Sequence, residues 1–519
     1  MLKFFNRRFF ILFIFPIFLG GLSVLSFQPF NFFFVNFLSL TLLFLLIIYV
    51  KKKSKSIYRK KPFLKNLFFL GSSYGFGFFF FGLYWIANSL TFDSSFKFLI
   101  PFALILIPLF LSLFFSIPII FAGNFIDKNI SSIFLISLFF SIGDFLRSTM
   151  LTGFPWNLWA YSFSWSQESL QILSKIGTFS FNLIVITFFF SLAVLFTKNK
   201  SKYFFISLIF LIAVSNYFYG SYAINSKKYE ENIKKINFKI ASASIELSDF
   251  KNPKEVASKL IKFSEPSKEK ATIFIWPEGI FLNQEFNKKE IKSLFRENFS
   301  DNHLIVFGAN TTKKENKKEK KYFNSMLVVD RDLNIISQYD KKKLVPFGEF
   351  LPFEKYLELV GLNKVVTGYS SFSEGKNSSS LQIKFEKQNI NFLPLICYEI
   401  IFQELVEKNK DKFDFIINIS EDAWFGHSIG PHQHFAKGIF RSIESRSYII
   451  RSANKGISAF ISPNGTVLKS LEADESGNIE MQLPILEKND SDQTKKSLIF
   501  LSLLITYIFT FFILRKLKI

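Results

Sequence analysis

The stretch INFLPLICYE, residues 390–399, decides how the polar half of this chain folds. It is an apolar run of strand length that stops at Cys397 and Glu399, where a turn or a helix is expected to begin. The stretches IFIWPEG (residues 273–279) and YDKKKLVPFGEFLP (residues 339–352) stop in the same way, with charged side chains directly after an apolar segment. Because side chains converge at the strand ends of α/β sheets, the three stretches predict one shared site.

The region around these stretches, from Asn237 onward, alternates short β-rich runs with amphipathic charged segments. Such alternation is typical of a layered α/β domain. The predicted strands are residues 239–245, 272–276, 304–307, 325–329, 335–339, 390–396, 413–419, 448–451 and 458–461. The predicted helices are residues 253–263, 288–298, 399–408 and 434–445.

The sequence before position 220 consists mainly of long Phe, Leu and Ile runs. A hydrocarbon core about 30 Å thick needs roughly 20 apolar residues in a helix, so these runs predict membrane spans. The predicted spans are residues 9–25, 32–50, 66–87, 98–121, 130–145, 179–197, 203–218 and 497–514. We therefore expect a polytopic helical membrane bundle of about eight spans, with one large polar domain inserted before the last.

Positive charge is distributed unevenly along the chain, which holds 63 Lys and Arg against 41 Asp and Glu, a formal net charge of +22. Lys and Arg collect before the first span, between spans two and three, between spans six and seven, and after the last span. By the positive-inside rule both termini are cytoplasmic, and the polar domain, which follows seven spans, lies outside. That placement excludes nucleic acid as a partner. The single Cys excludes an internal disulfide framework and a Cys-based zinc site.

Two features of the spans admit structural explanations. Gly71 and Gly75 form a small-xxx-small pair, which is typical of close helix packing. Asp144 and Arg147 lie at the outer end of span five, where we prefer an interfacial ion pair with an aromatic belt over a lipid-headgroup site.

Cys397 is the only thiol, and most free Cys residues are small buried hydrophobes. Its place before a predicted helix start favours a nucleophile instead, because a helix N-terminus lowers a thiol pKa and supplies N–H groups to an oxyanion. No Cys–His arrangement is evident, so Glu278 is the best candidate for the base. Lys341 alone, beside two other lysines, would be a weak signal. The cluster His427, His432 and His434 lacks the ligand spacing of a metal site, and we predict neither metal nor cofactor.

Taken together, Trp-Pro-Glu278, the segment from Tyr339 to Pro352 and Ile-Cys397-Tyr-Glu resemble the carbon–nitrogen hydrolase (nitrilase) superfamily. The segments LVPFGEF (residues 344–350) and DAWFG (residues 422–426) are similar to those of apolipoprotein N-acyltransferases within it. So are DFLR (residues 144–147) and LTGFPW (residues 151–156) in the membrane part. The resemblance covers nearly the whole chain.

The resemblance implies an α-β-β-α nitrilase-like sandwich with a Glu–Lys–Cys triad. Glu278 would be the general base and Cys397 the nucleophile that holds the acyl chain as a thioester. Lys341 would stabilise the tetrahedral oxyanion together with the backbone N–H of Tyr398. Glu349 matches a fourth polar residue near the triad, and Tyr398 and Glu399 match the positions that follow the nucleophile.

The sequence and the resemblance together predict three parts: a seven-span bundle (residues 1–220), a catalytic domain (221–490) and a final span with a cytoplasmic tail (491–519). The expected reaction moves an acyl chain from a membrane phospholipid to the α-amino group of the diacylglyceryl-Cys of apolipoproteins. We expect a monomer in the bacterial inner membrane, with the catalytic domain on the periplasmic side. The alternatives are a membrane-tethered amidase, in which water is the acceptor, and a transporter or scaffold whose domain has lost activity. The intact set of Glu278, Lys341 and Cys397 argues against the second.

Overall fold

The computed structural model describes residues 7–54, 60–197, 199–226, 234–282, 284–314, 320–352, 371–376, 380–409, 413–486 and 495–519. The chain divides into two compact units. The first, here called the helical unit, comprises residues 1–91, 97–227 and 492–519. The second, the sheet unit, comprises residues 228–491 together with the short segment 92–96.

The helical unit contains eight helical segments that are long and apolar enough to span a membrane, counted over the described residues. They are Arg7–Ser26, Val35–Ser54, Phe63–Thr91, Ser94–Gly123, Ser131–Thr149, Leu173–Phe196, Ser201–Asn225 and Lys496–Lys516. Their α-helical parts are α1 (Arg7–Phe9), α2 (Phe15–Ser23), α3 (Val35–Ser54), α4 (Lys60–Leu83), α5 (Ile100–Gly123), α6 (Ser131–Thr149), α8 (Leu173–Phe190), α9 (Ser201–Asn225) and α15 (Lys496–Lys516), and the short α7 (Gln167–Leu170) precedes α8. All eight predicted spans are confirmed as helices of sufficient length.

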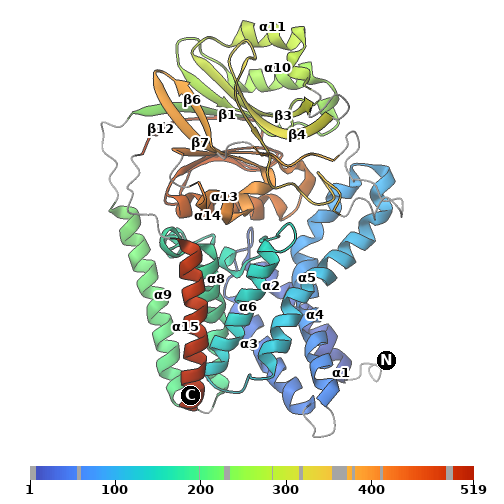
Figure 1. Ribbon diagram of the computed structural model, residues 1–519, viewed down its shortest axis with the longest axis vertical. Coiled ribbons are helices and arrows are strands. Elements are labelled where there is room, and N and C mark those ends of the chain that lie inside the picture. Colours follow the sequence, from blue (N-terminus) through green and yellow to red (C-terminus); the bar gives the residue numbers. More distant parts are fainter. Residues whose placement is uncertain are drawn as a thin grey trace. The chain divides into compact units, whose positions relative to one another are not determined.

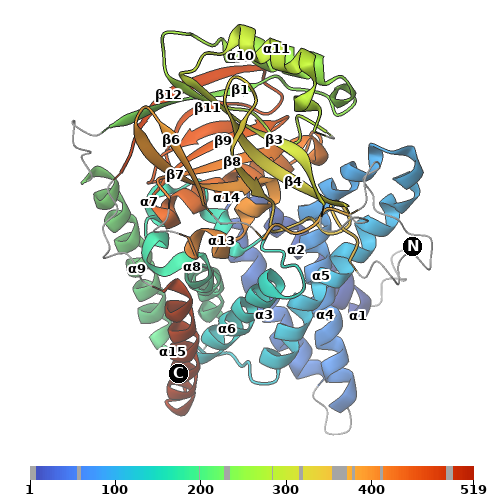
Figure 2. The same cartoon turned by 45° about the horizontal axis from the view of Figure 1, so that its top comes forward.

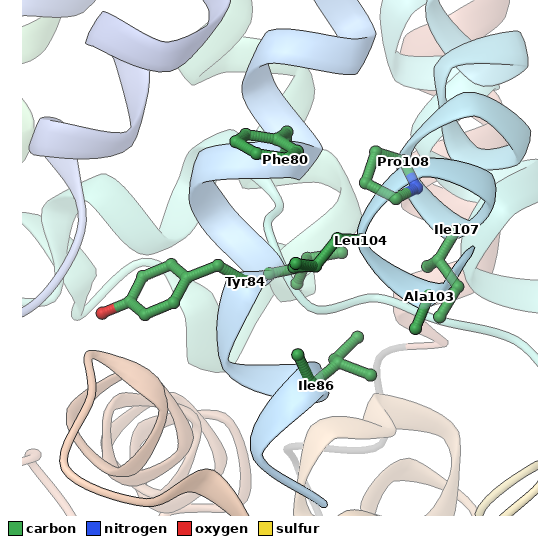
Figure 3. A pocket seen from close by; sticks show the side chains of 9 residues that line it. Phe80, Tyr84, Ile86, Ala103, Leu104, Ile107 and Pro108 are labelled. Carbon is green, nitrogen blue, oxygen red and sulfur yellow. The ribbon is translucent and has the colours of Figure 1, made fainter. Parts of the chain in front are cut away.

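Helices α4 and α5 pack closely over the predicted small-residue pair. A Cβ atom added at Gly71 would lie 2.6 Å from Ser116 Cα, and one at Gly75 would lie 2.9 Å from Ser112 Cα, so only glycine fits this contact. Beyond it the two helices border a small apolar pocket (Figure 3). Phe80 is among the α4 residues that line it.

The Asp144–Arg147 pair is more deeply buried than the interfacial pair that we expected. The two residues are 4% and 2% exposed, and Arg147 Nη2 donates to Asp144 Oδ1 over 2.9 Å. Arg147 also donates to the carbonyl of Phe154, and Asn182 Nδ2 donates to Asp144 Oδ2 over 2.9 Å. The pair therefore links α6, α8 and the loop after α6, and its hydrogen bonds replace the water that an exposed pair would have.

Basic residues from distant parts of the chain gather at one end of the helical unit. Lys51 Nζ lies 2.8 Å from Asp127 Oδ1, in the loop after α5. Arg515, at the end of α15, donates to the carbonyl of Phe125 in the same loop over 3.2 Å. The ends of α3 and α15 thus meet the same loop, on one side of the bundle.

The sheet unit is built from two six-stranded sheets, in the orders β12-β1-β2-β3-β4-β5 and β11-β10-β9-β8-β7-β6. Figure 1 shows this unit as stacked layers. The strands of the first are β1 (Lys235–Ser242), β2 (Thr272–Ile275), β3 (His303–Lys314), β4 (Lys320–Val329), β5 (Ile335–Asp340) and β12 (Gly477–Pro484). Those of the second are β6 (Leu381–Phe385), β7 (Gln388–Ile396), β8 (Phe415–Glu421), β9 (Tyr448–Asn454), β10 (Ser458–Ile461) and β11 (Val467–Leu471). All nine predicted strands are present, and β6, β11 and β12 were not predicted.

Figure 2 shows the layers of this unit, and two apolar cores hold these layers together. Successive side chains of a strand point to opposite faces, so Ile273 and Ile275 enter the core between the sheets, while Phe274 packs on the opposite face. That outer face is covered by α10 (Pro253–Ser264) and α11 (Lys289–Asn298), and α14 (Gly430–Ser445) packs on the second sheet. The predicted α-β-β-α arrangement is thereby confirmed.

The predicted helix 399–408 is wrong in its bounds. The chain forms a 3-10 turn, η10 (Cys397–Ile401), and then the short helix α13 (Gln403–Glu407). Phe402 separates them because its backbone is extended, with φ −90° and ψ 107°. The turn therefore begins directly at Cys397.

Candidate active site

Glu278, Lys341 and Cys397 each follow the last residue of a strand, or stand close behind it. Glu278 lies beyond β2, Lys341 directly follows β5, and Cys397 directly follows β7. The first two come from one sheet and the third from the other. The structure brings them together: Lys341 Nζ lies 3.4 Å from Glu278 Oε1, and Glu278 and Cys397 contact the neighbouring residues Glu421 and Ser420.

Lys341 is held between two carboxylates. Its Nζ atom lies 3.4 Å from Glu278 Oε1 and 2.9 Å from Glu349 Oε1, and the side chain is 1% exposed. Burial by itself lowers the pKa of Lys341, but the two carboxylates outweigh it and raise the pKa above its usual value. Lys341 is therefore a fixed positive charge in a site shielded from water.

Asn324, in the middle of β4, is a site residue that the sequence did not reveal. Its Nδ2 atom donates to Glu278 Oε1 and to Glu349 Oε1, both over 2.7 Å. The backbone carbonyl of Asn324 accepts from the backbone N–H of Lys341 over 2.8 Å. The other oxygen of Glu278 accepts from the backbone N–H of Glu421 over 2.9 Å. Both oxygens of Glu278 are thus fixed in direction.

Glu399 connects the turn after β7 to the segment after β5. The carboxylate is fully buried and accepts from Tyr339 Oη and from the backbone N–H of Lys342, each over 2.8 Å. It also accepts from the backbone N–H of Lys343 over 3.1 Å and from that of Ile396 over 2.8 Å. Glu399 therefore sets the positions of two strand ends.

Cys397 has a backbone conformation that L-residues rarely adopt, with φ +48°. A non-glycine residue in the left-handed region costs on the order of 1–3 kcal/mol, and such strain concentrates at functional sites. The strand-to-turn change at this residue leaves Cys397 half-buried, with part of its surface open to an incoming group. A small buried hydrophobe would not need this geometry.

The pKa of Cys397 departs from the sequence-based expectation. A helix N-terminus was expected to lower it, but burial and then the Glu278 carboxylate raise it well above the ordinary value of 9.0. Lys341 and a hydrogen bond with Ser420 act in the opposite direction without reversing the result. The resting residue is consequently a thiol, which needs a base before it can attack.

The three histidines that the sequence grouped together have different surroundings. His427 is 90% exposed and lies 3.2 Å from Asp474, whereas His434 is fully buried. The Nδ1 atom of His434 lies 3.0 Å from Asp422 Oδ1. Its Nε2 atom lies 3.2 Å from the backbone carbonyl of Cys397. No local pattern of residues indicates this contact with the turn.

Two family profiles match the chain. The apolipoprotein N-acyltransferase N-terminal domain matches residues 19–191, and the carbon–nitrogen hydrolase family matches residues 238–485. An amidase of known structure from Nesterenkonia sp. is 14% identical and covers 53% of this chain and all of its own, with a TM-score of 0.33.

Relatives that carry the name apolipoprotein N-acyltransferase match nearly the full chain. The protein of Rickettsia prowazekii is 31% identical over 475 residues, which is 90% of each chain. That of Rickettsia bellii is 32% identical over 423 residues, or 80% of this chain and 82% of the relative, and that of Rhizobium rhizogenes is 29% identical over 476 residues. These matches confirm the resemblance that the motifs indicated. With its helical unit, its two-sheet unit and this likeness, the chain belongs to the apolipoprotein N-acyltransferase family.

Proposed function

We propose that the protein transfers an acyl chain from a membrane phospholipid to the α-amino group of the diacylglyceryl-Cys at the N-terminus of apolipoproteins. The full-length relatives support this activity. The observation that carries the mechanism is the buried ammonium of Lys341 between Glu278 and Glu349, next to a thiol in a strained turn. A covalent intermediate divides such a transfer into two easier steps.

In the first step Glu278 takes the thiol proton and Cys397 attacks the ester carbonyl of the phospholipid. The Lys341 ammonium and the Tyr398 N–H stabilise the tetrahedral oxyanion, and its collapse breaks the C–O bond. The lysophospholipid leaves with the proton that Glu278 returns to its alkoxide oxygen, and the acyl chain remains as a thioester. Preorganised donors of this kind are worth several kcal/mol where water is excluded.

In the second step the amine of the apolipoprotein attacks the thioester. Glu278 takes a proton from the attacking amine, the C–S bond breaks, and the thiol is restored when that proton returns to sulfur. Glu349 has a supporting role, because it binds Lys341 and is held by the backbone N–H of Val345 over 2.8 Å. Glu399 supports the same site through the two strand ends that it connects.

The proposed location is the bacterial inner membrane, with the sheet unit on the periplasmic side. The gathering of Lys51 and Arg515 at one end of the helical unit supports a single cytoplasmic face. An odd number of spans precedes the sheet unit, which is then outside. Membrane embedding suits both lipid substrates, since removing an acyl chain from the bilayer costs about 0.8 kcal/mol per CH₂.

The test uses the full-length protein in detergent with a phospholipid radiolabelled in its acyl chain. The wild-type protein should carry a hydroxylamine-sensitive label, and Cys397→Ala should carry none. A diacylglyceryl peptide added afterwards should take up the label as an amide, which mass spectrometry detects. Labelled free fatty acid in place of the amide would favour the amidase alternative, and a labelled Cys397→Ala variant would refute the thioester.

A further inference from the structure

A buried polar cluster lies beside the nucleophile, and the two steps above do not use it. It consists of Ser420, Asp422, His434 and Arg451, none of them more than 1% exposed. Arg451 Nη2 donates to Asp422 Oδ2 over 2.7 Å, and Ser420 Oγ donates to Asp422 Oδ1 over 2.6 Å. Removing one partner from a buried charged cluster leaves an uncompensated charge, which is strongly destabilising.

The ring of His434 joins this cluster to the turn that carries Cys397. The carbonyl oxygen of Cys397 can only accept, so the Nε2 atom 3.2 Å away carries a hydrogen and donates it. The Nδ1 atom lies 3.0 Å from Asp422 Oδ1 and 3.2 Å from Arg451 Nη2. A neutral ring can accept from Arg451 and a charged ring can donate to Asp422, and the Nε2 donor is present in both cases.

The carbonyl that His434 binds is one end of the peptide unit between Cys397 and Tyr398. A trans peptide is planar, so its C=O and N–H groups point in opposite directions and rotate together. The other end of this unit is the Tyr398 N–H, the donor assigned above to the oxyanion. Holding the carbonyl therefore fixes the direction of the N–H.

The peptide lies at the very start of a short turn. The first N–H groups of a helical turn have no partners within it, and η10 is only five residues long. The positive φ of Cys397 is an unfavourable backbone conformation, which persists only where surrounding contacts stabilise it. Through His434, α14 adds a contact to this peptide from outside the turn.

We propose that His434 is a positioning residue that aims the Tyr398 N–H at the oxyanion, with Asp422 and Arg451 holding its ring. The inference rests on the proposed function, because it assumes that Cys397 is acylated by an ester. The ring touches neither substrate nor the reacting atoms. Its effect reaches the reaction through one peptide unit.

The experiment compares two reactions of Cys397 in the full-length protein in detergent. Acylation by a radiolabelled phospholipid needs the oxyanion donor, whereas alkylation by iodoacetamide displaces iodide and forms no oxyanion. Cys397 is the only Cys in the chain, so all thiol alkylation reports on it. Loss of one oxyanion donor slows reaction on the order of 10²–10³-fold.

We expect His434→Leu to slow acylation by that order and to change alkylation little. His434→Gln, which retains an N–H donor, should recover much of the acylation rate. The matched control is His303→Gln, because His303 is also a buried ring whose Nε2 meets backbone carbonyls, those of Ser267 at 2.9 Å and Lys270 at 3.2 Å. The control should leave both rates near those of the wild type.

Unchanged acylation in His434→Leu would overturn the inference. So would an equal loss of acylation and alkylation, which would assign His434 to general packing of the turn. A wild-type protein that forms no thioester at all would instead refute the proposed function, and the inference with it. The three results are distinguishable. In the first His434→Leu retains the wild-type acylation rate, in the second it loses acylation and alkylation equally, and in the third the wild-type protein itself is not acylated.

Discussion

Replacing Lys341 by Met is expected to destabilise the sheet unit strongly. The ammonium lies 3.4 Å from one Glu278 oxygen and 2.9 Å from one Glu349 oxygen. With an effective dielectric constant of about 20, the two attractions are about 5 and about 6 kcal/mol. Desolvation and the repulsion between the carboxylates offset much of this, and removing one partner of a buried ion pair typically costs about 3–5 kcal/mol. For a unit of this size the thermal midpoint should fall by roughly 6–20 °C.

The loss should depend on the second carboxylate. Without Lys341 the buried site holds two carboxylates with no cation between them, and their repulsion destabilises the folded state. Adding Glu349→Gln removes one of the two charges and should restore part of the midpoint.

Thermal unfolding of the full-length variants, followed by tryptophan fluorescence, measures these effects. Lys343→Met is the matched control, because Lys343 pairs with Glu404 over 2.8 Å while both side chains are about one-third exposed. An exposed pair contributes at most about 1 kcal/mol, so this midpoint should move little. Equal losses in the two Lys variants, or no recovery in the double variant, would refute the reasoning.

Gly308→Ala should slow acylation on the order of 10²-fold in the labelling assay, because its Cβ would lie 2.5 Å from Glu278 Cα and would displace Glu278. Gly438→Ala is the control, because its Cβ meets only one side-chain atom, at 3.3 Å. The rate of Cys397 alkylation should still rise above pH 9, because burial and Glu278 raise the thiol pKa. Glu278→Gln should abolish acylation and shift the pH profile of alkylation to lower pH. A shift of that profile to higher pH would contradict this electrostatic explanation. Glu399→Gln should cost about 3 kcal/mol in thermal unfolding, since an amide cannot accept all four hydrogen bonds of the carboxylate, and an unchanged midpoint would show that the site tolerates the loss.

The candidate triad could be predicted because its members interrupt apolar runs. Glu278, Lys341 and Cys397 stand where a buried strand ends, and the change from apolar to polar residues is visible in the sequence itself. Most of the predicted strands are buried along nearly their whole length, as β2, β8, β9 and β10 show, whereas β5 is buried only at its last two residues. A one-dimensional apolar signal is strong where both faces of a sheet are covered.

The parts that escaped prediction depend on pairing or on opposing forces. Strands β11 and β12 have few buried positions, so their apolar signal is weak. Asn324 is one polar residue within a strand, and only the register of β4 against its neighbours reveals that it reaches two carboxylates. Burial and the carboxylates of Glu278 and Asp422 raise the pKa of Cys397, while Lys341 lowers it, and no local motif contains these separate segments.

The pairing of β1 with β12 has a consequence for how such an enzyme can arise. The two strands run antiparallel with Lys235 opposite Pro484, so the first and last strands of the sheet unit are neighbours. A module whose entry and exit adjoin can be placed within a single loop of a host protein without separating the elements on either side. One insertion event would suffice to place a hydrolase domain of this kind within a membrane protein. By the same geometry, a circular permutant that joins these two strands and opens elsewhere should retain the hydrolase architecture.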